Sequence, residues 1–168
     1  RRVTYGMTAQ ADVSAQDIRY NESFGSTFKV FKGDDELGEI FMPVPGKHNI
    51  YNALAATAVA LELDVPFSKI SESFASFKNA NRRFQFKGEA QGIAVVDDYG
   101  HHPTEILATL SAAKNGSGGR RTVVIFQPHR YSRTRELMNE FALAFNNADV
   151  LFLTDIYAAS EQPIEGIT

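Results

Sequence analysis

The sequence predicts an α/β protein with a parallel sheet, and two observations carry that prediction. Three short apolar runs rich in β-branched residues follow one another, at residues 92–96, 121–126 and 150–154. Stretches with helical apolar spacing separate them, which gives a β-α-β-α-β order. That order favours parallel strands, because a crossover helix returns the chain to the same end of the sheet. We therefore expect one cleft to collect the polar residues that follow the three runs.

The composition is that of a globular protein with neither a membrane nor a nucleic acid as partner. The chain has 168 residues, 43% of them hydrophobic, and a formal net charge of −3. Its apolar runs have strand length, far below the roughly 20 residues of a membrane helix, and no basic tract resembles a nucleic-acid surface. The lack of cysteine excludes disulfides and thiolate metal sites and fits a cytoplasmic location.

Residues 1–43 are expected to form β-structure. Residues 13–20 have extended character, and two further strands, at 24–31 and 37–42, flank the hairpin-type sequence Gly33-Asp34-Asp35. Pro43 and Pro45 then close this strand region.

Two helices should follow the strands. Residues 49–63 carry apolar side chains at helical spacing together with many alanines, and Asp64-Val65-Pro66 stops that pattern. Ser68 is the expected N-cap of a second helix, with Ile70, Phe74 and Phe77 on its apolar face.

A composition boundary near residues 79–81 divides the chain into two domains, 1–79 and 80–168. In the second domain we expect strands at 84–89, 92–96, 121–126 and 150–154, and helices at 103–114 and about 132–146. Pro103 suits the first helical turn, and Glu105 suits the positive end of that helix. The chain starts and stops abruptly, so we expect both domains to be partial.

Asp97, Asp98, His101, His102 and His129 have the side-chain types of a metal site. Their spacing does not match a zinc motif, so a transient Mg²⁺ contact through a carboxylate fits better than structural zinc. The purely structural alternative is that one aspartate caps the helix at Pro103 while the histidines bond locally. We prefer that alternative for His102, and a functional role for Asp98 and His101.

Arg130 and Arg133 lie at the expected start of a helix, where guanidinium groups and free amide N–H groups together can bind a carboxylate or a phosphate. An equally good interpretation is a solvated first turn whose arginines pair with Glu136 and Glu140. Composition does not separate the two.

His48, Asn49 and Asn52 open the alanine-rich helix. Amide side chains at a helix start ordinarily cap it, but they can also read the edge of a nucleotide base. Two other activities have little support. No phosphate-binding loop of the Gly-x-x-x-x-Gly-Lys-Ser/Thr type is present, and no serine lies in a nucleophile elbow.

Five segments of the chain together resemble the Mur ligase family. The match runs in order from about residue 4 to the end, and its longest motifs contain the Asp-Asp-Tyr-Gly-His-His-Pro-Thr-Glu and Gln-Pro-His-Arg-Tyr sequences. The segments are Pro45–Ala53, Arg82–Phe84, Asp97–Glu105, Phe126–Thr134 and Asp155–Ala159.

The resemblance implies an ATP-dependent amide ligase of peptidoglycan precursor synthesis, a cytoplasmic activity on which cell-wall formation, cell shape and division depend. The chain would carry the end of a central ATPase domain and the start of a Rossmann-like C-terminal domain. ATP and Mg²⁺ are the implied cofactors, and UDP-N-acetylmuramate and L-alanine the implied substrates. The muramate carboxylate would be phosphorylated by ATP, and the alanine amine would then attack the acyl phosphate.

The family's motifs assign roles to particular residues. On the nucleotide side, His48, Asn49 and Asn52 match the adenine motif, Arg83 matches an arginine near the γ-phosphate, and Asp98 matches the ribose-binding aspartate. Residues around the amino acid and the sugar carboxylate are matched by Tyr99, His101, Arg130 and Arg133. The implied catalytic set is Arg83, His101, Arg130 and Arg133. Because the nucleotide side draws on both domains, catalysis should need domain closure.

The sequence also departs from the family pattern. The phosphate-binding loop and the main Mg²⁺ ligands of the family are missing from residues 1–168, so we expect this chain alone to be inactive and assign it no metal ligand. Ser160 stands where the family usually has glycine, and residues 79–81 replace a common Gly-Val. Two alternatives remain, namely a peptidoglycan-recycling ligase that adds a tripeptide and a nucleotide-binding module without catalysis. The Gln127–Tyr131 segment argues against the recycling ligase.

Overall fold

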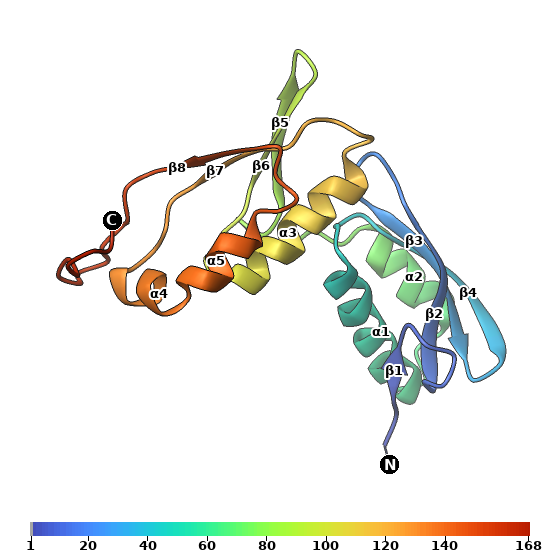
Figure 1. The fold of residues 1–168 in the computed structure, drawn as a ribbon. Helices are drawn as coiled ribbons and strands as arrows, with labels where there is room; N and C mark the ends of the chain where they lie inside the picture. The colour runs from blue at the N-terminus through green and yellow to red at the C-terminus, as the bar shows by residue number, and fades with distance from the viewer. Residues whose placement is uncertain (1) are drawn as a thin grey trace.

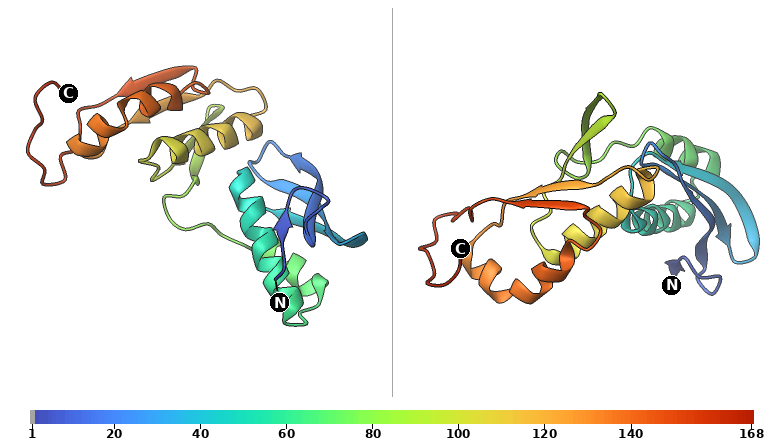
Figure 2. Two further views of the ribbon diagram at one scale, coloured as in Figure 1. Left: turned by 60° about the horizontal axis from the view of Figure 1, so that its bottom comes forward. Right: turned by 45° about the horizontal axis from the view of Figure 1, so that its top comes forward.

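The computed structural model describes residues 2–168 and divides into two units, each with its own apolar cluster (Figures 1 and 2). The first unit combines a four-stranded sheet with two helices. The second combines two small sheets with three helices. The predicted α/β class is therefore confirmed. Within residues 2–168, no helix has both the length and the apolar character needed to cross a bilayer.

The first sheet has the order β1-β2-β3-β4. Its strands are β1 (Tyr5–Gly6), β2 (Val13–Tyr20), β3 (Ser26–Lys32) and β4 (Asp35–Met42). The predicted hairpin is present, since β3 and β4 are antiparallel and Lys32 lies opposite Asp35 across a two-residue turn. Gly33 has a φ of +60° in that turn, a conformation that glycine adopts without strain.

Helices α1 (Lys47–Glu62) and α2 (Phe67–Ala75) cover one face of this sheet (Figure 2). Ile50 and Leu54 of α1 and Ile70 of α2 pack against fully buried strand residues such as Phe28 and Ile40. The small alanine side chains of α1 allow its close approach to the strands.

Two predicted details of α2 are wrong. The N-cap position is held by Pro66 rather than Ser68, and no side chain caps the helix. Pro66 precedes the helix with an extended ψ of 137°, and its missing N–H group costs no helical hydrogen bond there. The helix therefore begins at Phe67, one residue before Ser68. Phe77 lies beyond the end of α2 and is 45% exposed, so it is not part of the buried face.

The second unit begins with the antiparallel hairpin of β5 (Gln85–Ala90) and β6 (Ile93–Asp97), which projects away from the rest of the chain (Figure 1). The prediction that residues 92–96 join a parallel sheet is wrong. Within residues 2–168, β6 pairs with β5 in an antiparallel arrangement. The reason is local. Gln91 and Gly92 both have positive φ values and form a two-residue turn, the geometry that favours a hairpin.

The parallel pair consists of β7 (Val123–Phe126) and β8 (Val150–Leu153). Helix α3 (Pro103–Gly116) precedes β7. The predicted single helix between β7 and β8 is instead two short helices, α4 (Tyr131–Glu136) and α5 (Met138–Ala144), because Leu137 leaves the helical conformation with φ −111° and ψ 22°.

Helices α3 and α5 cover one face of the β7–β8 pair. Ile106 and Leu110 of α3 and Phe141 of α5 are buried there, and the ring of Phe126 lies 5.7 Å from that of Phe141. On the opposite face Ile125 is 76% exposed and Phe152 56%.

The two units meet at Phe24, in the loop between β2 and β3. Its ring lies 5.2 Å from that of Phe84 and 5.9 Å from the guanidinium carbon of Arg120. It also touches the last residue of α3, Gly116. This aromatic contact joins residues that are far apart in the sequence.

Candidate functional site

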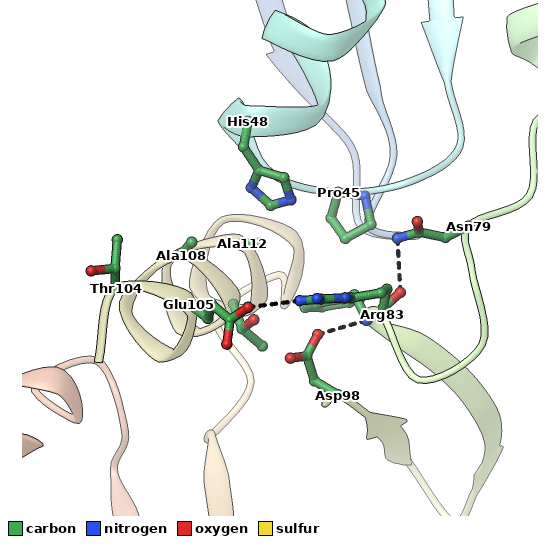
Figure 3. Close-up of a pocket in the computed structure, with 11 residues that line it drawn as sticks. Pro45, His48, Asn79, Arg83, Asp98, Thr104, Glu105, Ala108 and Ala112 are labelled. Atoms are coloured by element: carbon green, nitrogen blue, oxygen red, sulfur yellow. Dashed lines mark hydrogen bonds and ion pairs between the residues drawn. The ribbon is translucent and has the colours of Figure 1, made fainter. Parts of the chain in front are cut away.

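A cavity of about 220 Å³ lies where the two units face each other (Figure 3). Ligand pockets usually enclose roughly 300–1,000 Å³, so the cavity can hold only part of a nucleotide-sized molecule. Its polar lining comes from the start of α1, from the segment before β5, and from the loop and helix after β6. The lining residues are Pro45, His48, Asn79, Arg83, Phe84, Asp98, Thr104, Glu105, Ala108, Thr109 and Ala112.

Asp98, directly after β6, is held by two backbone N–H groups. Its Oδ2 accepts a hydrogen bond from Phe84 N at 2.7 Å, and its Oδ1 accepts one from Gly100 N at 2.6 Å. Each carboxylate oxygen has a further lone pair, so the side chain can still accept a bond from a ligand hydroxyl. Asp98 thus ties the start of β5 to the end of β6 and remains available to the cavity.

Arg83 forms an ion pair with Glu105 across the cavity, with 3.0 Å between Nη1 and Oε1 (Figure 3). The guanidinium is about half exposed, with 47% of its side-chain surface accessible. An exposed guanidinium with one carboxylate partner is well placed to bind an anion, because several of its donors remain free of that bond.

His48 enters the cavity from the first turn of α1. Its ring lies over Gly46, so closely that a β-carbon at position 46 would come within 2.5 Å of the imidazole Cε1. Burial lowers the pKa of His48, Asp98 opposes that shift, and Arg83 adds to it. His48 therefore faces charged groups of the second unit, and its lowered pKa favours the neutral imidazole.

Asn49 and Asn52 are not among the cavity-lining residues. Asn49 is buried and donates from Nδ2 to the Pro45 carbonyl at 2.6 Å, while Asn52 is exposed and donates to Asn49 Oδ1 at 3.4 Å. In this structure Asn49 therefore stabilises the turn before α1. The helix-capping interpretation is wrong for α1, because Gly46 holds the N-cap position and no side chain caps the helix.

The N-cap of α3 is His102, not an aspartate. Its Nδ1 accepts a hydrogen bond from Thr104 N at 3.3 Å, and Glu105 completes a capping box by accepting from His102 N at 3.2 Å. The local role preferred for His102 is confirmed. The aspartate cap considered as an alternative is wrong, because both oxygens of Asp98 are bonded to other amides.

A second group of rings lies beside the cavity, where the loops after β6, β7 and β8 converge. The ring of His101 lies 5.2 Å from that of Tyr99 and 6.3 Å from that of His129, and the ring of Tyr157 lies 5.4 Å from His129. Three chain reversals therefore do meet, although among residues 2–168 β6 pairs with β5 and not with β7 or β8.

Arg130 and Arg133 flank the start of α4 but use different partners. Arg133 Nη1 donates to the His129 carbonyl at 3.2 Å, whereas Arg130 Nη1 lies 3.9 Å from Glu161 Oε1. Glu161 also accepts from the amide and hydroxyl groups of Ser132, at 2.9 and 2.6 Å.

The sequence left open whether Arg130 and Arg133 bind a ligand anion or pair with carboxylates of the chain, and for Arg130 a carboxylate of the chain is nearby. Glu161 accepts from the amide and hydroxyl of Ser132, so a carboxylate of the chain itself occupies the anion-binding position at the start of α4. The same bonds lower the pKa of Glu161. Glu161 takes this position in place of Glu136, whose ion pair is with Arg135 at 3.8 Å.

The sequence pattern missed the wider role of Glu105. It was expected to favour the helix N-terminus, yet it also bonds Arg83 and the His101 amide. The role of Glu161 has no clear signal in the sequence beyond a carboxylate four residues after Tyr157. No group of three or more metal-binding side chains occurs among residues 2–168.

Both halves of the chain match models of known protein families. Residues 82–167 match the family described as Mur ligase, glutamate ligase domain, and residues 1–60 match the Mur ligase middle domain.

Two curated relatives carry the name UDP-N-acetylmuramate--L-alanine ligase. The protein of Trichlorobacter lovleyi is 61% identical and that of Geotalea daltonii 60%, over the whole of this chain. The chain spans 37% and 36% of their lengths. Among solved structures, the UDP-N-acetylmuramate-alanine ligase MurC of Thermotoga maritima aligns with a TM-score of 0.80 at 31% identity, over 92% of this chain and 34% of that protein.

Proposed function

The chain belongs to the Mur ligase family, and from that premise we propose that the full-length protein joins L-alanine to UDP-N-acetylmuramate with ATP as the energy source. The names of relatives about 60% identical over the whole chain support this choice of substrates. The chain spans little more than a third of those relatives, so the activity is assigned to the full-length protein. We assign the reaction to the cytoplasm, and the absence of cysteine from the chain fits that location.

The proposed reaction has two steps. An oxygen of the muramate carboxylate attacks the γ-phosphorus of ATP, and ADP leaves. The alanine nitrogen then attacks the acyl phosphate carbon, phosphate leaves with the bonding electron pair, and the amine loses a proton to solvent or a base. Such chemistry asks the protein chiefly to align two anions and to neutralise charge on the transferred phosphoryl group.

The single observation that carries the proposal is the cavity between the units. His48 reaches it from α1, and Arg83 and Asp98 reach it from the second unit. We assign Arg83 to the transferred phosphoryl group and Asp98 to a ribose hydroxyl, because a half-exposed guanidinium suits an anion and a carboxylate with free lone pairs suits a hydroxyl donor. Asn49 and Asn52, on the first turn and a half of α1, are assigned to the adenine side.

The group beside the cavity is assigned to the other two substrates. Tyr99, His101, Arg130 and Arg133 would surround the incoming alanine and the sugar carboxylate. Arg130 and Arg133 bring positive charge to a region where two carboxylates have to approach each other. Mg²⁺ would accompany ATP, but the described residues do not offer a cluster of ligands for it, and no step above is assigned to a metal.

The test is a substrate comparison with the purified full-length protein. Phosphate release should require ATP, UDP-N-acetylmuramate and L-alanine together, and the product should gain the mass of one alanine residue. A tripeptide acceptor is the competing arm, and preferential use of it would replace this proposal with the recycling reaction. The 168-residue chain by itself should release no phosphate above background, because it has no phosphate-binding loop.

A further inference from the structure

We propose that Glu105 is a positioning residue that holds Arg83 and the loop of residues 99–102 in one fixed relation. The inference rests on the proposed function, since it assigns Glu105 to the coupling of the phosphate side of that site to its amino-acid side. Glu105 touches no substrate in this role and acts only through its neighbours.

The two oxygens of Glu105 face opposite sides of the site. Oε1 pairs with Arg83 Nη1 at 3.0 Å (Figure 3). Oε2 accepts from the amides of His101 and His102, at 3.0 and 3.2 Å. His101 Nδ1 also lies 3.6 Å from Oε2. One carboxylate therefore contacts the guanidinium assigned to phosphate and the loop that carries Tyr99 and His101.

The charge of Glu105 is well stabilised where it stands. Burial alone would raise the pKa of this carboxyl, but hydrogen bonds from the His101 amide, the Arg83 guanidinium and the His102 amide bring it down to about 2. The positive end of α3 favours the same ionised form. The group is thus ionised at neutral pH.

A capping-box glutamate ordinarily bonds only the backbone at the start of its own helix. Glu105 does this through His102 and adds Arg83, which lies 22 residues earlier. The added bond is not needed to cap α3. It does restrict a long, flexible arginine side chain that would otherwise sample many rotamers at the edge of the cavity.

Two substitutions at position 105 separate the contact with Arg83 from the contacts with the loop amides. Glu105→Gln keeps a carbonyl oxygen that can accept from the loop amides, but it removes the charge that holds Arg83. Glu105→Ala removes both contacts. In the full-length protein, Glu105→Gln should lower kcat by about 10-fold with little change in the KM for L-alanine, whereas Glu105→Ala should also raise that KM by about 5-fold or more.

The decisive experiment adds an Arg83→Gln background. If Glu105 acts through Arg83, then Glu105→Gln should change kcat by less than about 2-fold when Arg83 is already replaced. A merely structural glutamate would reduce kcat equally in both backgrounds, and that result would overturn the proposal. Glu140→Gln, which removes an exposed charge from the first turn of α5, is the matched control and should leave kcat unchanged.

Hydrogen–deuterium exchange of residues 99–102 gives a readout that needs no turnover. Exchange should be faster in Glu105→Ala and close to wild type in Glu105→Gln. If the wild-type protein makes no product from L-alanine, the proposed function fails, and the exchange result then decides alone. Unchanged exchange in Glu105→Ala would overturn the role of Glu105 as well, whereas faster exchange would support its hold on the loop.

Discussion

Phe24 lies directly against Gly116, so that a β-carbon at position 116 would come within 2.5 Å of Phe24 Cδ1 and 3.0 Å of Phe24 Cα. The first residue belongs to the β2–β3 loop and the second ends α3. The glycine is needed here for space, because the backbone of one unit touches that of the other.

The first prediction follows from this contact. Gly116→Ala should destabilise the protein by about 1–3 kcal/mol, since the added methyl forces Phe24 or the end of α3 to move. Urea unfolding of the purified protein measures the change. Gly6→Ala is the control, because a β-carbon there would have its nearest neighbour at 3.8 Å, an ordinary contact.

The same contact can be tested by pairing the substitutions. In a Phe24→Ala background the shortest contact, 2.5 Å to the ring atom Cδ1, is removed while the 3.0 Å contact to Cα remains, so the cost of Gly116→Ala should become smaller without vanishing. Fully additive costs would show that the ring of Phe24 is not what the methyl meets.

The second prediction concerns Asp98. Asp98→Asn places an amide NH₂ against one of the two N–H donors, from Phe84 or Gly100, and leaves that donor unpaired. We expect a loss of about 1–3 kcal/mol in the free energy of unfolding, together with weaker ATP binding.

Asp97→Asn is the matched control for that change. The Asp97 side chain forms ion pairs with Arg82 at 3.5 Å and Lys87 at 3.8 Å, and about half of each partner's side chain is exposed. Such pairs contribute less than about 1 kcal/mol. Equal effects of the two substitutions on urea unfolding would contradict the role given to the Asp98 amide bonds.

The third prediction is an acid dependence that Glu105 causes. Its pKa is about 2 in the folded protein against 4.5 for an ordinary glutamate. A carboxyl with a lowered folded-state pKa stabilises the fold fully above its unfolded pKa, and the contribution disappears as pH falls from about 4.5 towards 2. After allowance for solvent screening, the contribution is about 1–2 kcal/mol.

Glu105→Gln should therefore flatten the stability profile in that pH window. Thermal unfolding at pH values between 5 and 2.5 is the measurement, with wild type and variant converging at the acid end. A variant whose profile runs parallel to that of the wild type would contradict the lowered pKa of Glu105 as a source of stability.

The fourth prediction concerns Arg130. In the full-length protein, Arg130→Ala should lower kcat/KM for L-alanine or for the sugar acid by about 10- to 100-fold. Stability should hardly change, because the side chain is half exposed and its Glu161 partner lies 3.9 Å away. Arg135→Ala, on the same helix and paired with Glu136, should leave the kinetics unchanged.

Local pattern predicted much of the fold. The strand β2 has the predicted bounds, and α1 begins within two residues of the prediction, because their signals are periodicity and flanking proline. The sheet containing β6 could not be predicted in this way. An apolar run does not show which neighbour it pairs with, and the Gln91-Gly92 turn made the nearest strand in sequence the partner.

The candidate site, too, could be predicted from the sequence only in part. The convergence of Tyr99, His101 and His129 followed from the order of strands and helices, since residues after successive strands tend to meet. The bond from Glu105 to Arg83 did not follow, because a glutamate that only caps a helix has the same local sequence as one that also reaches across a cavity. The Glu161 contact with Ser132 was missed for a similar reason, as 29 residues separate the partners.

The two apolar clusters have no residue in common, since every member of the first comes before residue 75 and every member of the second after residue 105. Each can therefore lose its order while the other keeps it, and the protein need not melt as one cooperative block. A calorimetric scan should show two overlapping heat-absorption peaks. The aromatic junction at Phe24 would then determine how far apart they lie, which makes the separation of the peaks a direct measure of how strongly the two halves are coupled.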